Sequence, residues 1–285
     1  MIGAKDIDLV QTEKSQIIQK SGLLEMVQLR EAMQDIGGLE KLKPWLEQKS
    51  QIFADWPAAR DFGVESPKGV MIVGMPGCGK SLTAKATAKL FGLPLLKMDI
   101  GSLMGKYVGE SEGNMRRAIA VAEAVSPCVL WVDEVEKAFA GIGSGAAGSE
   151  VATRLFGYFL TWMQEKTAQV FVVTTANDIS VLPPELLRKG RFDEIFYVDF
   201  PNEAERKAIF RVHLDKRKKM NQQIDLHKLA KATDKYSGAD IESIVKEGIE
   251  RAFLANRAEL DTQRLMQVIE ATHPLGMVMK DKVKQ

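Results

Sequence analysis

Short apolar runs alternate with longer amphipathic stretches over the first two thirds of the chain. Five of these runs have the length and the β-branched or aromatic content of strands, and the stretches between them have helical periodicity. This alternation favours a parallel sheet with crossover helices. The expected strands cover residues 70–73, 95–99, 129–132, 170–173 and 195–198. The expected fold class is therefore α/β, a five-stranded parallel sheet flanked by helices.

The pattern changes after Pro201. From Glu203 to Thr272 helical periodicity recurs without a convincing strand, with breaks near residues 219–223 and 236–238, which predicts a small α-helical lid subdomain. The expected organisation is a helix-prone, polar linker or N-terminal remnant at 1–34, an α/β subdomain at 35–201, the helical lid at 202–273 and a basic C-terminal tail at 274–285.

Charge and composition narrow the class of partner. The chain has 285 residues with 39 basic and 38 acidic side chains, a formal charge of +1, so no global field draws it to nucleic acid or to an anionic membrane. No apolar run approaches the roughly 18 to 20 residues of a membrane span, and the first residues do not resemble a signal peptide. We expect a cytoplasmic protein with no membrane span that does not act on nucleic acid.

The run from Gly74 to Ser81 fits the pattern G-x-x-x-x-G-K-[ST], and it stands between an expected strand and an expected helix. Glycines let such a loop wrap around phosphate oxygens, Lys80 would neutralise phosphate charge, and Ser81 would ligate Mg²⁺. The alternative is a Gly-rich turn that binds nothing. The pattern predicts a P-loop NTPase fold, and the residues expected at the nucleotide are Pro76, Gly77, Cys78, Gly79, Lys80, Ser81 and Leu82.

Two carboxylates, Asp133 and Glu134, follow the third expected strand directly. This places them at the carboxyl edge of the sheet, where α/β folds bind their ligands. Asp133 would hold Mg²⁺, and Glu134 would orient and polarise the water that attacks the γ-phosphate. A solvated helix cap is the alternative for such a pair.

The segment from Thr174 to Asp193, with its Thr-Thr-Ala-Asn run and its Arg-Lys-Gly-Arg run, closely resembles the second region of homology of classical AAA ATPases. The resemblance implies that Asn177 senses the γ-phosphate and that Arg188 and Arg191 project into a neighbouring subunit's site. It also implies a homo-oligomeric ring, most simply a hexamer, that uses ATP and Mg²⁺. The alternative is a surface turn with two solvated arginines.

The resemblance extends over about residues 35–270. The Asp-Ile-Gly-Gly-Leu run at 35–39 is similar to the family's entry motif, which implies that the backbone of Gly37 contacts adenine. Ile209 and His213 match the lid-helix pattern that packs on the base, although a lone histidine is more often structural. The Ser-Gly-Ala-Asp turn at 237–240, with Gly238 and Ala239, stands where other AAA+ branches carry a sensor arginine that classical members lack.

Within the family, residues 126–131 and 161–167 look most like the single-module AAA proteins of cyanobacteria and plastids. Those proteins are usually longer at the N-terminus. We therefore expect this chain to be a fragment or a short relative.

The loop at 105–111 resembles the aromatic pore loop of AAA rings that thread polypeptides. Tyr107 would grip an extended client, Lys106 would add a rim charge and Val108 would complete the contact. The alternative is an aromatic side chain that packs against its own subunit. A flexible Gly-rich stretch at 141–148 could line the same channel or serve as a connector.

The sequence thus predicts a Mg²⁺-dependent AAA ATPase that remodels, unfolds or disassembles an unknown protein client. Two other functions stay open. One is a nucleic-acid-directed AAA+ factor, which salt-dependent stimulation by DNA would indicate. The other is a regulatory scaffold that uses ATP as an assembly switch and threads nothing.

Overall fold

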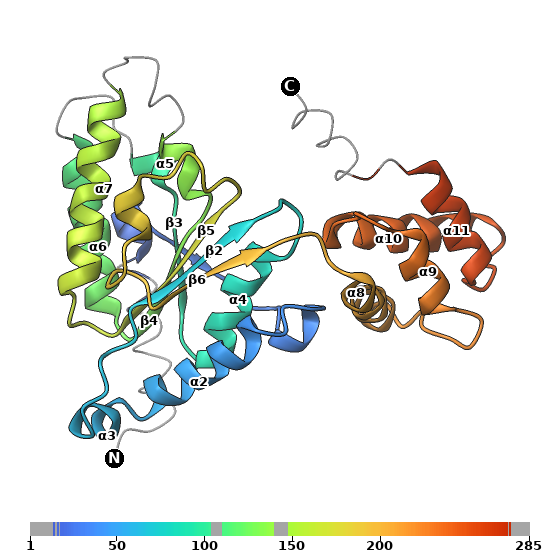
Figure 1. The fold of residues 1–285 in the computed structure, drawn as a ribbon, viewed down its shortest axis with the longest axis horizontal. Helices are drawn as coiled ribbons and strands as arrows, with labels where there is room; N and C mark the ends of the chain where they lie inside the picture. The colour runs from blue at the N-terminus through green and yellow to red at the C-terminus, as the bar shows by residue number, and fades with distance from the viewer. Residues whose placement is uncertain are drawn as a thin grey trace. The chain divides into compact units, whose positions relative to one another are not determined.

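A computed structural model describes residues 14, 16, 18–103, 110–139, 148–272 and 274. Its centre is a six-stranded sheet in the order β1-β3-β4-β5-β2-β6 (Figure 1). The strands are β1 (Glu25–Val27), β2 (Gly69–Gly74), β3 (Leu95–Met98), β4 (Cys128–Val132), β5 (Val170–Ala176) and β6 (Glu194–Val198). The α/β class is confirmed, and each of the five expected strands is found within a few residues of its expected bounds.

The expected number of strands is wrong by one. The extra strand is β1, which pairs antiparallel with β3, whereas β3, β4, β5 and β2 are parallel neighbours. Its three residues, Glu-Met-Val, are too few to show a period-two pattern, and they lie in a segment expected to be helix-prone. The open edge of β3 supplies the backbone partners that the local sequence does not reveal.

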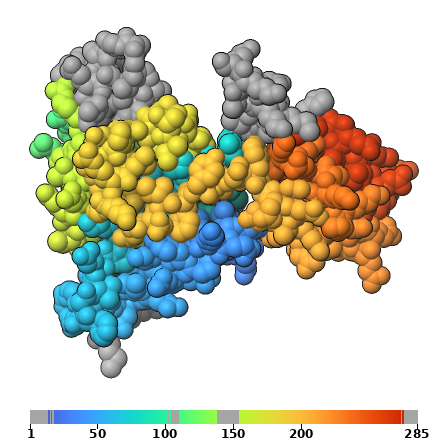
Figure 2. Space-filling view, in the orientation of Figure 1, coloured from blue at the N-terminus to red at the C-terminus, as the bar shows by residue number. Residues whose placement is uncertain are grey.

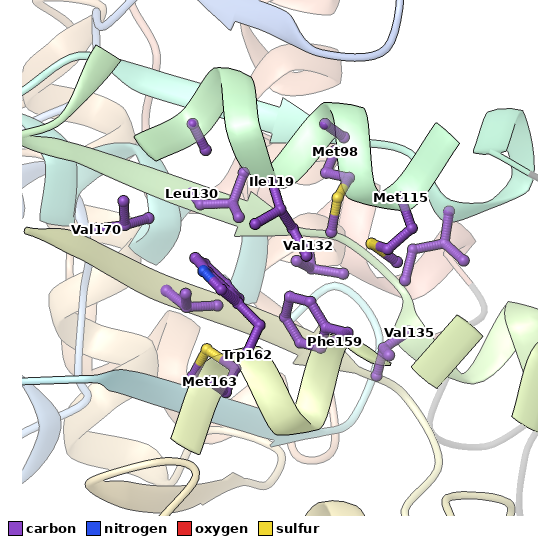
Figure 3. Packing of buried hydrophobic residues seen from close by; sticks show 14 of the residues in the cluster. Met98, Met115, Ile119, Leu130, Val132, Val135, Phe159, Trp162, Met163 and Val170 are labelled. Atoms are coloured by element: carbon purple, nitrogen blue, oxygen red, sulfur yellow. The ribbon is translucent and has the colours of Figure 1, made fainter. Parts of the chain in front are cut away.

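Side chains of the central strands alternate between the two faces of the sheet. One face carries Met71, Met98, Leu130, Val132 and Val172, which belong to a single buried cluster. Helices α6 (Glu110–Val125) and α7 (Gly148–Glu165) cover this face (Figure 1). Figure 3 shows their apolar side chains meeting those of the strands. Burial of this kind is worth roughly 25 cal/mol per Å² and supplies most of the stability of the sheet.

The opposite face carries Phe171, around which aromatic rings gather. Its ring lies 4.8 Å from Phe91, 6.1 Å from Phe53 and 6.4 Å from Trp45, measured between centroids. These rings come from α2 (Leu42–Ala54) and α4 (Lys80–Phe91), so both faces of the sheet are covered. The shorter elements of this part of the chain are η1 (Met33–Asp35), α3 (Trp56–Asp61), α5 (Ile100–Leu103), η2 (Val135–Phe139) and η3 (Pro184–Leu187).

After Val198 the described chain is helical and has its own core. The helices are α8 (Glu203–Lys216), α9 (Leu226–Ala232), α10 (Gly238–Leu254) and α11 (Thr262–Ala271). Leu214, Leu229, Ile241 and Leu265 are fully buried within it. The atoms of this helical part form the orange-to-red region of Figure 2. Capping boxes at Asn202 and Ser237 begin α8 and α10 by satisfying amide groups of their first turns.

Within the described residues, no helix combines the length and the apolar character needed to cross a bilayer.

Candidate functional site

The expected site residues fall into two compact units that interleave along the chain. The described residues within 1–32, 44–73 and 84–197 form the first unit, and those within 33–43, 74–83 and 198–285 form the second. The phosphate loop and the lid therefore belong to one unit, and the acidic strand end belongs to the other.

The phosphate loop leaves β2 and runs directly into α4. Gly74, Gly77 and Gly79 have φ values of 143°, 75° and 87°, a region that L side chains rarely adopt. A Cβ atom on Gly74 would lie 1.9 Å from the carbonyl oxygen of Val198. Helix α4 begins at Lys80, so its positive N-terminal dipole faces the end of the loop. This backbone is the kind that binds anions in P-loops.

The side chains of the loop differ in their exposure. Lys80 is buried, and its Nζ donates to the carbonyl oxygens of Gly74 and Met75, at 2.7 Å each. Ser81 is exposed, and Pro76 and Leu82 are half-buried. The side chain of Lys80 thus lies folded along its own loop.

Cys78 is half-buried in the loop, and its Sγ lies 3.7 Å from the carbonyl oxygen of Pro76. Burial raises the pKa of the Cys78 thiol to about 11, although the nearby Lys80 opposes the shift. Cys78 is therefore a neutral thiol near pH 7 and a poor nucleophile.

The turn at the start of α10 is joined to the phosphate loop. The amide of Ala239 donates to the carbonyl oxygen of Gly77 at 3.0 Å. A Cβ on Gly238 would lie 3.2 Å from that same oxygen, and one on Gly77 would lie 2.7 Å from Oγ of Ser237. The sequence placed Gly77, Gly238 and Ala239 at one site, and the structure brings these three residues together.

The entry motif contacts the first lid helix at Gly37. A Cβ there would lie 2.5 Å from Cγ1 and 2.7 Å from the backbone nitrogen of Ile209, so only glycine fits. Ile209 itself is buried. The neighbouring amide of Leu39 donates to Glu205 Oε1 at 3.4 Å, which also ties the motif to α8.

His213 lies one helical turn after Ile209 on α8. Burial lowers the pKa of His213 to about 4, while the carboxylate of Glu242 acts in the opposite direction. Nη1 of Arg217 lies 3.3 Å from Nδ1 of His213. Because arginine only donates, Nδ1 is the acceptor, and the neutral ring carries its proton on Nε2.

The acidic strand end is organised by Thr175, a residue that the sequence analysis did not single out. Its hydroxyl donates to Oδ1 of Asp133 at 2.6 Å and accepts from the amide of Glu134 at 3.1 Å. Glu134 has a φ of 49°, in the left-handed region that residues other than glycine seldom adopt. One side chain on β5 thus fixes both the metal-binding candidate and the strained backbone of the candidate base.

The carboxylate of Glu134 has two partners. Nδ2 of Asn177 donates to Oε1 at 3.3 Å, and the ammonium of Lys137 pairs with Oε2. The hydrogen bond from Lys137 holds the pKa of the Glu134 carboxyl below its usual range. Nδ2 of Asn177 also donates to Glu136 Oε1 at 2.7 Å, and the amide of Asn177 donates to the same oxygen at 3.0 Å. Glu134 and Asn177, predicted as one site, are in contact.

Lys97 and Trp131 lie beside this group, and the sequence analysis did not single out either as a site residue. Nζ of Lys97 is 3.5 Å from Oδ2 of Asp133 and 4.7 Å from the centroid of the Trp131 ring. The signal in the sequence is a lysine inside an otherwise apolar strand, in the run Leu-Leu-Lys-Met. Glu136 and Lys137 carried a weaker signal, as charged residues that follow the acidic pair after Val135.

The arginine-bearing segment is anchored at the amino end of β2. Oδ2 of Asp193 accepts from the amides of Lys68 and Gly69, at 2.9 and 3.0 Å, and Nζ of Lys68 donates to the carbonyl oxygen of Gly190 at 2.8 Å. Arg188 is exposed. Arg191 is half-buried, and its Nη1 is enclosed with no hydrogen-bond partner among the described residues. The two arginines therefore differ in their freedom to reach another chain.

The predicted pore-loop residues Lys106, Tyr107 and Val108 and the stretch 141–147 lie outside the described residues. The described part of the chain contains no cluster of three or more His, Cys, Asp or Glu side chains arranged as metal ligands.

Comparison with known proteins agrees with this arrangement. The model of the ATPase family associated with various cellular activities (AAA) matches residues 70–200, and that of the AAA+ lid domain matches residues 223–267. The AAA domain-containing protein ycf46 of Pyropia yezoensis is 45% identical over 284 residues, which cover 99% of this chain and 57% of the relative.

Two other relatives extend the comparison. The ycf46 protein of Guillardia theta is 43% identical over 285 residues, which cover 100% of this chain and 56% of the relative. The human ATPase family gene 2 protein homolog A is 35% identical over 240 residues, which cover 82% of this chain and 26% of the relative. The chain spans about half the length of the curated ycf46 relatives it matches. The P-loop fold with its helical lid and these matches together show that the chain belongs to the AAA ATPase family.

Proposed function

We propose that the chain is a Mg²⁺-dependent ATPase that works in a homo-oligomeric ring and uses hydrolysis to remodel, unfold or disassemble a protein client. The observation that carries this proposal is the group Asp133, Glu134, Thr175 and Asn177 at the carboxyl ends of β4 and β5. In the same unit, Val73 of β2 pairs with Ala176 of β5, the residue before Asn177.

The phosphate loop and the lid fit ATP. The φ values of Gly74, Gly77 and Gly79 suit a backbone that wraps an anion, and the N-terminus of α4 adds positive potential. When a nucleotide binds, Nζ of Lys80 would exchange its hydrogen bonds to the carbonyl oxygens of Gly74 and Met75 for contacts with the phosphates. Gly37, Ile209 and His213 would contact adenine, and a neutral His213 with a proton on Nε2 suits an uncharged base. The residues proposed to contact the nucleotide are Gly37, Pro76, Gly77, Cys78, Gly79, Lys80, Ser81, Leu82, Ile209, His213, Gly238 and Ala239.

Asp133 and Ser81 would hold Mg²⁺. Both offer hard oxygen ligands, and Thr175 fixes one carboxylate oxygen of Asp133 while the other faces the ammonium of Lys97. The cation would supply charge neutralisation at the β- and γ-phosphates.

Glu134 and Asn177 would act on the attacking water. A carboxylate with a lowered pKa is ionised at neutral pH and can accept a hydrogen bond from water. For that contact the carboxylate must exchange its pairing with the exposed Lys137 for the water. Asn177 would keep Glu134 in place and complete the polar surface toward the γ-phosphate.

Arg188 and Arg191 would complete the site of a neighbouring subunit, because a guanidinium fork stabilises charge on the transferred phosphoryl group. The exposure of Arg188 supports delivery to another chain.

Lys106, Tyr107 and Val108 would contact the client. The proposed organisation keeps an α/β subdomain at 35–201 and a lid at 202–273, with the protein in the cytoplasm and most simply a hexamer.

Two substitutions test the chemistry. Glu134→Gln should keep nucleotide binding and slow hydrolysis by about 10² to 10⁴-fold, the usual contribution of a general base. Lys80→Ala should lose nucleotide binding. Glu165→Gln, an exposed acid at the end of α7, is the matched control. Phosphate release and equilibrium nucleotide binding measure the two effects, and normal turnover in Glu134→Gln and Lys80→Ala would refute the assignment.

A mixing experiment tests the ring. Arg188→Ala should bind nucleotide normally but hydrolyse poorly, and mixing it with Lys80→Ala subunits should restore some activity. Arg211→Ala, an exposed arginine on α8, is the control. The mass of the native particle, measured with and without ATP, shows whether the subunits assemble. Full activity of Arg188→Ala in assembled particles would exclude an arginine supplied by the neighbour.

A further inference from the structure

Lys97 stands where the strand pattern calls for an apolar residue. Its strand neighbours Leu95, Leu96 and Met98 are fully buried. Its Cα partner on β4 is Trp131, and Asp133 follows two residues later. Because side chains alternate along a strand, Lys97, Trp131 and Asp133 share one face of the sheet.

The ammonium of Lys97 is held on two sides. It lies 4.7 Å from the centroid of the Trp131 ring and 3.5 Å from Oδ2 of Asp133, whose other oxygen accepts from Thr175 at 2.6 Å. The side chains of Lys97 and Asp133 are 32% and 20% exposed, so water screens this pair less than an open surface pair. The tryptophan face attracts a cation in its own right.

We propose that Lys97 is a built-in counter-ion of Asp133, a positioning residue that occupies the carboxylate oxygen until a divalent cation replaces it. The inference rests on the proposed function, in which Asp133 binds Mg²⁺. With no metal bound, Lys97 balances the charge of Asp133 and keeps the site able to accept an anionic nucleotide. With metal bound, the ammonium gives up Oδ2 and stays over the ring of Trp131.

This arrangement predicts a specific change when the charge is removed. Without the ammonium, metal-free nucleotide meets an uncompensated Asp133 and binds more weakly. Mg²⁺ no longer competes with the ammonium of Lys97 for Oδ2 of Asp133, so the nucleotide binds equally well or more tightly when Mg²⁺ is present. The ratio of the two dissociation constants therefore rises, whereas a general loss of folding would weaken both.

The experiment is an equilibrium titration of the full chain with a fluorescent ADP analogue, once in EDTA and once in Mg²⁺. In Lys97→Met the ratio of the dissociation constant in EDTA to the dissociation constant in Mg²⁺ should rise about tenfold. This is the scale expected for the loss of one unit charge at this distance in a partly screened site. Lys97→Arg keeps the charge and should stay within about twofold of the parent. A ratio that stays at the parent value in Lys97→Met would overturn the inference.

Further variants distinguish an error in the role of Lys97 from an error in the metal role of Asp133. Asp133→Asn should abolish the effect of Mg²⁺; if it does so while Lys97→Met behaves as the parent, only the role of Lys97 is wrong. If Asp133→Asn keeps the parent ratio, the metal role of Asp133 and the inference are both wrong. Lys49→Met is the matched control, because Lys49 lies 5.2 Å over Trp45 on α2. Lys97→Gln repeats the test should Lys97→Met not fold, with the same two outcomes.

Discussion

The two units position their candidate site residues by different means. At the acidic strand end of the first unit, hydrogen bonds at the ends of β4 and β5 hold the side chains of Asp133, Glu134 and Asn177. In the phosphate loop and lid of the second unit, the decisive groups are backbone atoms whose positions depend on glycine, as at Gly37 and Gly74. The first unit presents polar side chains, and the second presents main-chain geometry.

This difference predicts different responses to substitution. Where backbone carries the site, adding one methyl group is more damaging than changing a charge, because no rotamer relieves a clash with the main chain. Where side chains carry the site, an isosteric change removes the chemistry and leaves the fold intact.

Gly74→Ala should destabilise the protein by about 3 kcal/mol or more, because its Cβ would lie 1.9 Å from the carbonyl oxygen of Val198. Gly63→Ala is the matched control, since Gly63 also has a positive φ, 95°, but nothing lies within 4 Å of its added Cβ. In Gly63→Ala the free energy of unfolding should fall by only about 1 kcal/mol, because the alanine must adopt the strained φ angle. Denaturant unfolding measures both, and equal losses would contradict the backbone argument.

Thr175→Val should slow hydrolysis about tenfold or more and lower the free energy of unfolding by about 1–3 kcal/mol, because it leaves the Glu134 amide and the Asp133 carboxylate without their shared hydroxyl. Single-turnover hydrolysis and denaturant unfolding are the measurements.

The neighbouring threonine sharpens this test. The hydroxyl of Thr174 is buried and has no hydrogen-bond partner among the described residues. Thr174→Val should therefore leave the free energy of unfolding unchanged or raise it, since an unsatisfied buried hydroxyl is removed. A loss of stability in Thr174→Val as large as that in Thr175→Val would mean that hydrogen bonding does not distinguish the two positions.

The contribution of His213 to the free energy of unfolding depends on pH. Burial lowers the pKa of His213 to about 4, below the roughly 6.5 of an unfolded chain. The unfolded state therefore takes up the proton first, and the free energy of unfolding falls as the pH drops from about 6.5 toward 4. With these two pKa values the free energy of unfolding falls by about 2 kcal/mol between pH 7 and pH 5, and the His213→Gln variant should not show this loss.

Unfolding in urea at pH 7 and pH 5 measures this difference. His227→Gln removes an exposed histidine on α9 and controls for the loss of one titrating side chain. If His213→Gln loses as much stability on acidification as the parent, the histidine is not held neutral by its environment.

Much of the fold could be predicted because its signals are local. The central strands are mostly apolar runs, and the phosphate pattern and the acidic pair are short stretches directly after strands. Strand β1 could not be found this way, since Glu25, Met26 and Val27 carry no periodic signal and pair only because β3 has an open edge. Arg191 also has no local signal for the burial of its guanidinium.

Residues adjacent in the chain were enough to predict the family, the α/β class and the phosphate loop, because each of these signals is local. The contacts of Thr175 with Asp133 and Glu134, of Ala239 with Gly77, and of Lys97 with Trp131 and Asp133 are visible only in the folded chain. These contacts depend on strand register and helix packing. Hydrogen bonds between strands that are distant in sequence set which side chains share a face, and no local pattern encodes that pairing.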